Sequence, residues 1–241
     1  MLMTTIVSAF LSNVNSHRPV EEYIKFGKHL LLADVNKVIF IDEILYDSMS
    51  IYKNEKTLFI KINKHDIYLY AYVDKIINFS LSGADNTKDT LDYILIQCNK
   101  TEWLKQAIEL DFYKTEQFVW VDFGIRHILN CIDDDYRIKV ETLNCKSYDK
   151  VRIASIWNLN TFSNQNYYTT IMWYFAGGVF GGKKDKLLLF AELMKKQCLD
   201  IIETKGTLMW EVNVWYLIYQ LNSDLFSTYY CDHNNSIIDN Y

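Results

Sequence analysis

The hydrophobic pattern of the first forty or so residues alternates between strand-like and helix-like segments. Residues 4–10 form a short apolar run that is typical of a buried strand, and a polar loop follows at residues 12–18. Pro19 then opens a helix that we expect to continue to about residue 32, because proline suits the first position of a helix. Residues 37–41 form a second apolar run. Such alternation predicts a parallel sheet.

The rest of the pattern adds strands and helices to the same sheet. Two helices are expected between residues 87 and 110, with a break near Asn99 and Lys100, and longer ones at 184–203 and 207–221. The aspartates at 133–135 are interpreted as a solvated turn. The further predicted strand segments are 57–62, 67–72, 118–121, 137–143, 151–156, 171–175, 179–181 and 226–231. The pattern therefore predicts one mixed, mostly parallel α/β domain.

Composition narrows the class of protein. The chain has 241 residues, of which 50% are hydrophobic and 15% aromatic, so it can bury a sizeable core in one domain. Its net charge is −5 and its basic residues are scattered, which argues against nucleic acid as a partner. The five cysteines have no CxxC spacing and are expected to be reduced. We find no transmembrane segment or cleavable leader, and expect a cytoplasmic protein.

Asp122 directly follows the apolar run at residues 118–121. Ligands of open α/β sheets bind at the carboxyl ends of strands, so a carboxylate there is well placed to hold Mg²⁺ or Mn²⁺, which share oxygen ligands with substrate phosphates. The alternative is an aspartate that caps a helix beginning near Ile125. Gly124 slightly favours the functional interpretation, because it lets a ligand approach the turn closely.

Four of the eight glycines lie within six residues, at 177, 178, 181 and 182. Glycine destabilises regular structure where it is not needed, so this cluster indicates a local requirement of the backbone. The backbone at Gly177 and Gly178 is a candidate for close approach to a sugar or diphosphate. The alternative is a tight hairpin or bulge before the following helix.

Two further side chains are candidates, each with a plainer explanation. Glu211 lies beside Trp210 and shares a helix face with Trp215, so partial desolvation would make it a base, a nucleophile or a stabiliser of positive charge. The local pattern by itself favours an exposed glutamate in the first turn of a helix. His233 follows the last predicted strand and is a candidate metal ligand, whereas a lone histidine near a terminus is more often only solvated.

Taken together, these segments resemble the HtrL/YibB and WlaTC-like glycosyltransferase family, which has bacterial and large-virus members. The resemblance covers nearly the whole chain in order and is specific only as a set. The matching pieces are residues 4–10, 100–103 (Lys-Thr-Glu-Trp), 120–125 (Trp-Val-Asp-Phe-Gly-Ile) with His127, 173–182, 210–213 (Trp-Glu-Val-Asn) and 229–234.

The resemblance implies a fold and a division of the chain. It implies a GT-A-like, Rossmann-type, mostly parallel sheet flanked by helices, with a nucleotide-sugar half at residues 1–125 and an acceptor half at 126–241. The glycine segment and Glu211 also resemble the arrangement in retaining glycosyltransferases of the blood-group transferase kind. That second resemblance makes Glu211 the catalytic carboxylate and retention of the anomeric configuration the better guess. The donor-binding residues that the family resemblance implies are Ser8, Ala9, Phe10, Lys100, Asp122, Phe123, Gly124, Gly177, Gly178 and His233.

The implied metal site departs from the usual pattern of such folds. Asp122-Phe123-Gly124 stands where an Asp-x-Asp motif is usual, so the second aspartate is missing. A Mn²⁺ or Mg²⁺ held by Asp122, His233 and donor phosphates remains one expectation, and a metal-free mechanism is the other. Lys100 is expected to contact a phosphate as a point charge.

The expected function is transfer of a hexose from a nucleoside diphosphate sugar, first of all a UDP-sugar, to a hydroxyl of a glycan, lipid-linked sugar or protein. One alternative is a non-catalytic nucleotide-sugar or carbohydrate binder on the same fold, which the incomplete acidic motif favours. Another is a metal-dependent nucleotidyltransferase. The lack of a basic, glycine-rich phosphate loop after the first strand argues against the nucleotidyltransferase.

Overall fold

A computed structural model describes residues 4–12, 14, 17–83, 85–161 and 163–241. Within these residues a single seven-stranded sheet has the order β3-β2-β1-β4-β6-β5-β7. Its strands are β1 (Thr4–Phe10), β2 (Asn36–Asp42), β3 (Thr57–Ile62), β4 (Gln117–Val121), β5 (Val151–Ser155), β6 (Phe175–Lys183) and β7 (Phe226–Tyr230). The expected α/β fold built on a mostly parallel sheet is confirmed.

One strand of the sheet runs against the others. β1 pairs in parallel with β2 and β4, β2 with β3, and β5 with β7. β6 lies between β4 and β5 and is antiparallel to both. The carboxyl ends of the other six strands and the amino end of β6 therefore meet at one edge, which we call the carboxyl edge of the sheet.

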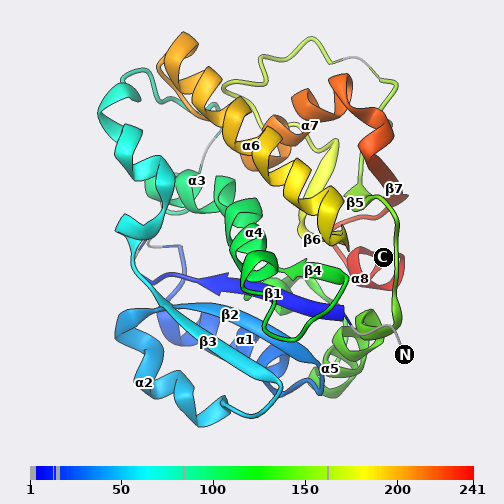
Figure 1. Ribbon diagram of the computed structural model, residues 1–241. Helices are drawn as coiled ribbons and strands as arrows, with labels where there is room; N and C mark the ends of the chain where they lie inside the picture. The colour runs from blue at the N-terminus through cyan, green and yellow to red at the C-terminus, as the bar shows by residue number, and fades with distance from the viewer. Residues whose placement is uncertain (1–3, 13, 15–16, 84, 162) are drawn as a thin grey trace.

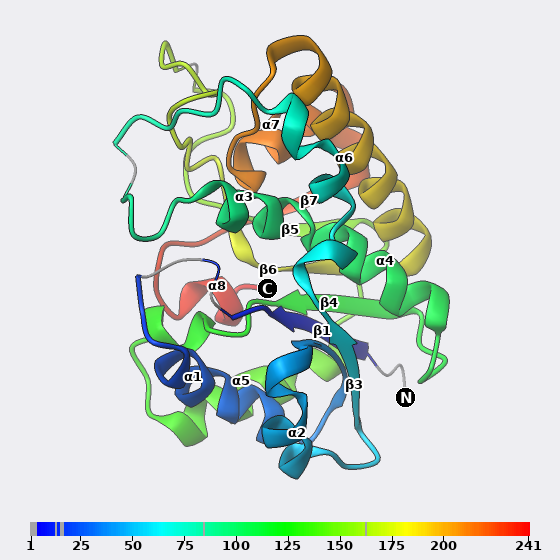
Figure 2. The same ribbon diagram turned by 90° about the vertical axis from the view of Figure 1, so that its left-hand side faces the viewer.

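Helices cover both faces of the sheet (Figures 1 and 2). One face packs against α1 (Val20–Leu32), α2 (Tyr46–Met49), α5 (Asp133–Thr142) and α8 (Ser236–Asp239). The other packs against α3 (Leu91–Cys98), α4 (Lys100–Leu110), α6 (Lys184–Lys205) and α7 (Glu211–Leu221). Successive strand residues alternate between the two cores, as Ile6 and Val7 do, because side chains of a strand point to opposite faces.

Short 3₁₀ helices make up much of the remaining chain. They span Glu43–Leu45, Ser50–Tyr52, Lys64–Asp66, Tyr68–Lys75, Ile125–Ile128, Leu143–Cys145 and Ser223–Leu225. All five cysteines are free thiols, as expected. Among the described residues, none of the helices is both long and apolar enough to cross a membrane.

The strand predicted at residues 67–72 is wrong, because this segment begins the 3₁₀ helix Tyr68–Lys75. Alternating tyrosines produced the strand-like pattern. β3 is already the last strand on its side of the sheet, so the segment bonds locally instead, with the Tyr70 backbone N–H donating to the Ile67 carbonyl. Leu69 is fully buried by this turn.

The strand predicted at residues 137–143 and the preceding solvated turn are also wrong, since both belong to α5. The three aspartates form the first turn of this helix, where the positive end of the helix dipole stabilises carboxylates. Tyr136 and Val140, four residues apart, are buried on one face of α5.

The glycine-rich segment is a continuous strand rather than a loop between two strand pieces. β6 runs through all four glycines and pairs with β4 from Gln117 to Val121. Gly182 has a φ of 142°, and a Cβ there would lie 2.2 Å from the Lys150 carbonyl oxygen. The neighbouring backbone therefore requires glycine at the far end of the strand.

Candidate functional site

A pocket of about 550 Å³ lies at the carboxyl edge of the sheet. The ends of β1 and β4, the beginning of β6 and the amino-terminal residues of α4 and α7 contribute to its lining. This edge is where open α/β sheets bind their ligands, because the loops that follow the strands diverge there.

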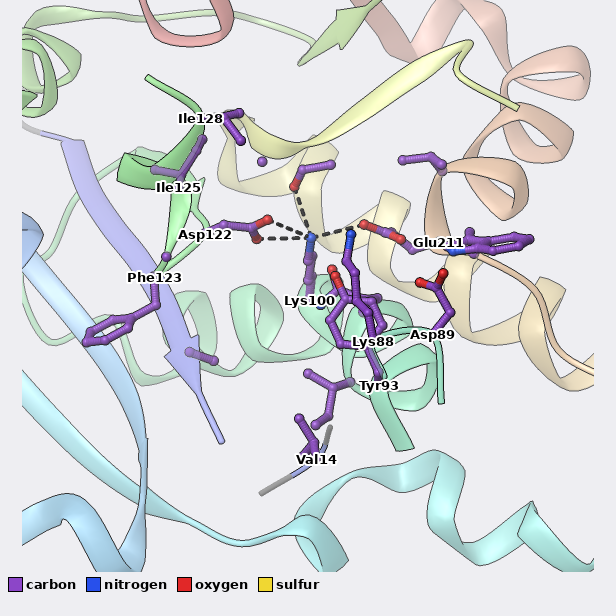
Figure 3. Close-up of a pocket in the computed structure, with 18 of the residues that line it drawn as sticks. Val14, Lys88, Asp89, Tyr93, Lys100, Asp122, Phe123, Ile125, Ile128 and Glu211 are labelled. Carbon is purple, nitrogen blue, oxygen red and sulfur yellow. Dashed lines mark hydrogen bonds and ion pairs between the residues drawn. The ribbon is translucent and has the colours of Figure 1, made fainter. Parts of the chain in front are cut away.

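Lys100, the first residue of α4, is the central cation of this pocket (Figure 3). Only 3% of it is exposed. Its Nζ lies 2.9 Å from Asp122 Oδ1 and 3.0 Å from Glu211 Oε1, and it donates to the Gly177 carbonyl oxygen at 3.2 Å. An ammonium group has three N–H donors, and three protein groups accept them here. We call Lys100, Asp122, Glu211 and Gly177 the lysine cluster.

Asp122 follows β4 directly, and its backbone N–H donates to the Gly178 carbonyl oxygen at 2.9 Å. Besides Lys100, its Oδ1 accepts a hydrogen bond of 2.6 Å from Trp120 Nε1. Burial raises the pKa of Asp122, while the Lys100 ammonium and the Trp120 N–H oppose that rise. The side chain does not cap the 3₁₀ helix Ile125–Ile128, so the capping alternative does not hold.

Glu211 begins α7, four residues later than the helix predicted from position 207. It is in the first helical turn, where the dipole favours a carboxylate, but it is buried with an exposed fraction of 6%. The interpretation as an exposed glutamate is therefore wrong. Among the described residues, its carboxylate pairs with the Lys100 ammonium.

Gly177 allows β6 to pass directly beside these charged groups. A Cβ at this position would lie 2.3 Å from Glu211 Oε1 and 3.2 Å from Lys100 Nζ. Any side chain would therefore displace the carboxylate or the ammonium. The backbone of Gly177 is thus closely approached by the side chains of Glu211 and Lys100, whereas its predicted approach to a sugar or diphosphate stays a prediction.

Most of the other predicted site residues share the pocket. Ala9, Phe10, Phe123, Gly124, Gly178 and His233 contribute to its lining. Phe10 and Phe123 stack with ring centroids 5.0 Å apart. Ser8 does not line the pocket; it is fully buried in β1, and its hydroxyl lacks a partner among the described atoms. In the loop at 8–18, Asn13, Asn15 and Ser16 lie outside the described residues.

His233 lies at the rim of the pocket, with 44% of its side chain exposed and its ring 4.5 Å from that of Trp173. Burial lowers its pKa, and Asp232 opposes that effect. Among the described residues no group of three or more His, Cys, Asp or Glu side chains is arranged to hold a metal ion. Because Asp122 is paired with an ammonium, Asp122 and His233 as arranged do not fit a divalent ion.

A family profile described as "Bacterial protein of unknown function (HtrL_YibB)" matches residues 3–234. The chain belongs to the HtrL/YibB family. The expected family resemblance is thereby confirmed over nearly the whole length of the chain.

Other comparisons add little to this membership. No curated protein matches the chain. Among solved structures, a 4-diphosphocytidyl-2C-methyl-D-erythritol synthase from Anaerococcus prevotii DSM 20548 is 8% identical with a TM-score of 0.45, covering 98% of this chain and 89% of that one. Rv0371c from Mycobacterium tuberculosis H37Rv is also 8% identical, with a TM-score of 0.44 and coverages of 100% and 93%. Its complex with manganese has a TM-score of 0.42 at the same identity, with coverages of 96% and 89%. Similarities of this size carry no argument about function.

The pocket of this HtrL/YibB protein also contains residues to which the sequence assigned no role. Lys88 and Asp89 line it from the segment that leads into α3, and Tyr93 lines it from the first turn of α3. Lys88 lies with its Nζ 5.7 Å from the centre of the Tyr93 ring and makes no ion pair with any residue that the structure describes. In the sequence, Lys88 was only a basic residue at the start of a predicted helical stretch.

A second overlooked feature joins the ends of β1 and β2. The backbone N–H and the hydroxyl of Ser12 both donate to Asp42 Oδ2, at 2.9 and 2.6 Å. Asp42 is the last residue of β2, and its position as a carboxylate at a strand end was the signal available in the sequence. The contact fixes the start of the loop that borders the pocket.

Proposed function

We propose that this HtrL/YibB protein is a glycosyltransferase that moves a hexose from a nucleoside diphosphate sugar to a hydroxyl acceptor. The observation that carries the proposal is the lysine cluster: two carboxylates from distant segments, Asp122 and Glu211, are held by one buried ammonium in a pocket at the carboxyl edge. Such a concentration of charge is costly to bury and is typical of functional sites.

The shape and place of the pocket support a nucleotide-sized ligand. Its volume, about 550 Å³, lies in the range of small-molecule sites. In the proposal, residues 1–125 bind the nucleotide and residues 126–241 bind the acceptor. The end of β1 at Ala9 and Phe10 would adjoin the base and ribose, with a UDP-sugar as the first donor to test.

Lys88 is the cation best placed to meet the diphosphate in this proposal. It lines the pocket, and no described carboxylate forms an ion pair with it. Arg18 also lines the pocket, but it already contacts Glu22 at 3.5 Å. Negative charge builds on the diphosphate as its bond to the sugar breaks, so a nearby ammonium group would stabilise this leaving group.

Glu211 is the proposed partner of the sugar itself. Cleavage of the donor leaves positive charge at the anomeric carbon, as it does in glycoside hydrolysis, and a carboxylate stabilises that charge or attacks the carbon. With Glu211 in this role we propose retention of configuration, which proton NMR of the product would report. The β6 backbone at Gly177 and Gly178 would position the sugar.

A bound Mn²⁺ or Mg²⁺ would act as a Lewis acid on the diphosphate. The arrangement of Asp122 and His233 does not fit such an ion, so no step of the proposed mechanism passes through one. In the proposal, the side chains of the pocket themselves bind the diphosphate and stabilise the charge on the sugar.

The test combines binding with turnover. Thermal-shift titrations with UDP, GDP, CMP and their sugars would identify the nucleotide, because a ligand that binds only the folded state raises stability. Release of nucleoside diphosphate from the stabilising sugar would then measure turnover. We expect Asp122→Asn and Glu211→Gln to lower it by about 100-fold or more.

Glu203→Gln is the matched control, since Glu203 is exposed near the end of α6 and does not line the pocket. It should leave turnover unchanged. Full activity in Glu211→Gln would refute the role of that residue. Binding of a nucleotide sugar without hydrolysis or transfer to any tested acceptor would instead identify a non-catalytic binder on this fold.

A further inference from the structure

We propose that the Lys100 ammonium is a built-in substitute for a divalent cation: it joins the two carboxylates of the pocket, so the site works without a metal ion. That a lysine replaces a metal ion concerns the cluster alone and does not depend on the proposed function. The consequence for donor binding rests on the function proposed above.

The ligand set around Lys100 Nζ consists entirely of oxygen atoms. Asp122 Oδ1 lies at 2.9 Å, Asp122 Oδ2 at 3.1 Å, Glu211 Oε1 at 3.0 Å and the Gly177 carbonyl oxygen at 3.2 Å (Figure 3). Carboxylate and carbonyl oxygens are the ligands that hard divalent cations take in proteins. The cluster therefore has the chemistry of a cation site, and its cation is a lysine.

The charges of the cluster explain why one cation must be present. Asp122 and Glu211 would repel each other if both were ionised in this pocket without a partner. Burial alone would lower the pKa of Lys100, but the two carboxylates outweigh burial and raise it, so the ammonium stays charged. Counted formally, one ammonium and two carboxylates give the cluster a single negative charge, which would face the positive charge that develops on the sugar as the diphosphate leaves.

Lys100 acts through its neighbours rather than on a ligand. Its three N–H donors are all accepted by protein groups, and only 3% of the residue is exposed. It is therefore a positioning residue that holds Glu211 and Asp122 in place. A phosphate contact would require it to release one of these partners, which leaves Lys88 as the cation available to a diphosphate.

Removing the lysine should turn the cluster into a metal site. Lys100→Ala would leave two carboxylates and a carbonyl oxygen around a space that a hydrated ion can enter. The oxygen atoms lie about 3 Å from the Nζ position. Ca²⁺, with bonds of about 2.3–2.6 Å, would require less movement than Mg²⁺, with bonds of about 2.0–2.1 Å.

The first measurement uses the wild-type protein. Mn²⁺ titration followed by electron paramagnetic resonance should detect no ion bound at the cluster, and UDP should bind with affinities that differ by less than about threefold between EDTA and Mn²⁺. Mn²⁺ binding that Asp122→Asn abolishes, together with UDP binding that is about tenfold or more weaker in EDTA, would overturn the proposal.

The second measurement uses Lys100→Ala with Lys105→Ala as its matched control. Lys105 lies on the same helix, with 19% of its side chain exposed, and pairs with Glu192 at the surface. Millimolar Mn²⁺ or Ca²⁺ should raise the melting temperature of Lys100→Ala by about 5 °C and leave the control unchanged. Adding Asp122→Asn to Lys100→Ala should remove this response.

The outcomes separate this proposal from the proposed function. If Lys100→Ala folds but neither Mn²⁺ nor Ca²⁺ changes its melting temperature, the proposal that lysine replaces a metal ion is overturned. If Lys100→Ala does not fold even with metal, the Mn²⁺ titration of the wild-type protein alone decides whether the cluster works without a metal ion. If no nucleotide binds under any condition, the glycosyltransferase proposal fails, while the metal responses of the two lysine variants still test the cluster.

Discussion

Two buried lysines lie near opposite edges of the sheet, and they differ in what surrounds them. Lys37, near the beginning of β2, is fully buried, and its Nζ donates to the carbonyl oxygens of Ala33 and Val35. Lys100, at the carboxyl edge, is almost as buried but bridges two carboxylates.

The two environments shift the two pKa values in opposite directions. Burial lowers the pKa of Lys37 to about 8, and the more distant Asp34 only partly opposes it. Around Lys100 the carboxylates outweigh the same effect of burial. Lys37 donates a hydrogen bond to the carbonyl of Ala33, the cap residue of α1, and so stabilises the end of this helix. Lys100 holds the acidic groups of the pocket. Burial alone does not distinguish a structural lysine from one in a site, but its partners do.

Replacing each lysine by an uncharged residue should produce the largest difference between the two sites, and the difference should be in the free energy of unfolding. Lys100→Met leaves two carboxylates without their cation and should lower the free energy of unfolding by about 3–5 kcal/mol. Lys37→Met removes a buried charge as well as two hydrogen bonds to carbonyl groups, so its effect at neutral pH should be within about 1 kcal/mol. Urea unfolding at pH 7 measures both. Equal losses in the two variants would contradict the comparison.

The closeness of Gly177 to the cluster predicts a loss of activity. In Gly177→Ala the new Cβ would lie 2.3 Å from Glu211 Oε1, so the carboxylate must move. A displacement of this size should lower turnover by about 100-fold. Gly178→Ala is the comparison variant. Its Cβ would meet the tip of Ile125 at 2.8 Å and that of Ile237 at 3.1 Å, and both tips can shift.

The kinetic assay for these two glycine variants is the one described for Glu211→Gln. A smaller loss in Gly178→Ala than in Gly177→Ala is expected. An undiminished rate in Gly177→Ala, with the protein folded, would show that the position of Glu211 is not critical.

The lowered pKa of Lys37 predicts a pH dependence of stability. Its folded pKa of about 8 is below the ordinary value of 10.5, so between these values the unfolded chain binds more protons and stability rises with pH. Relative to Lys37→Met, the wild type should gain about 2 kcal/mol between about pH 7.5 and about pH 9.5. Urea titrations of both proteins across this range give the difference. A flat difference would show that Lys37 titrates normally.

Much of the fold follows from local pattern, and its exceptions have physical causes. The strands at residues 4–10 and 57–62 and the long helix that begins at Lys184 stand where the pattern predicts them. α5 was mistaken for a strand because its apolar residues are few, and the aspartates that stabilise its first turn looked like a loop. β6 was predicted as two separate strand pieces, because glycines weaken a strand pattern even where tertiary contacts require them.

The members of the site were predictable, but their arrangement was not. Asp122, Glu211, Lys100 and Gly177 each carried a local signal. Lys100 is separated from Asp122 by 22 positions and from Glu211 by 111, and no local pattern indicates that one ammonium joins them. Lys88 was overlooked because a single basic residue before a helix is common in sequences of any function.

The reversed direction of β6 limits where this chain tolerates insertions and deletions. β6 leaves the pocket at Gly177 and ends at the opposite edge of the sheet, and the 22 residues of α6, about 33 Å of helix, return the chain so that α7 begins at Glu211. Removing one turn from α6 would shorten this return by about 5 Å and separate Glu211 from Lys100. The segment between β5 and β6 does not have to cross the sheet, because β5 ends and β6 begins at the same edge. Changes of length among relatives are therefore expected in that segment and not in α6.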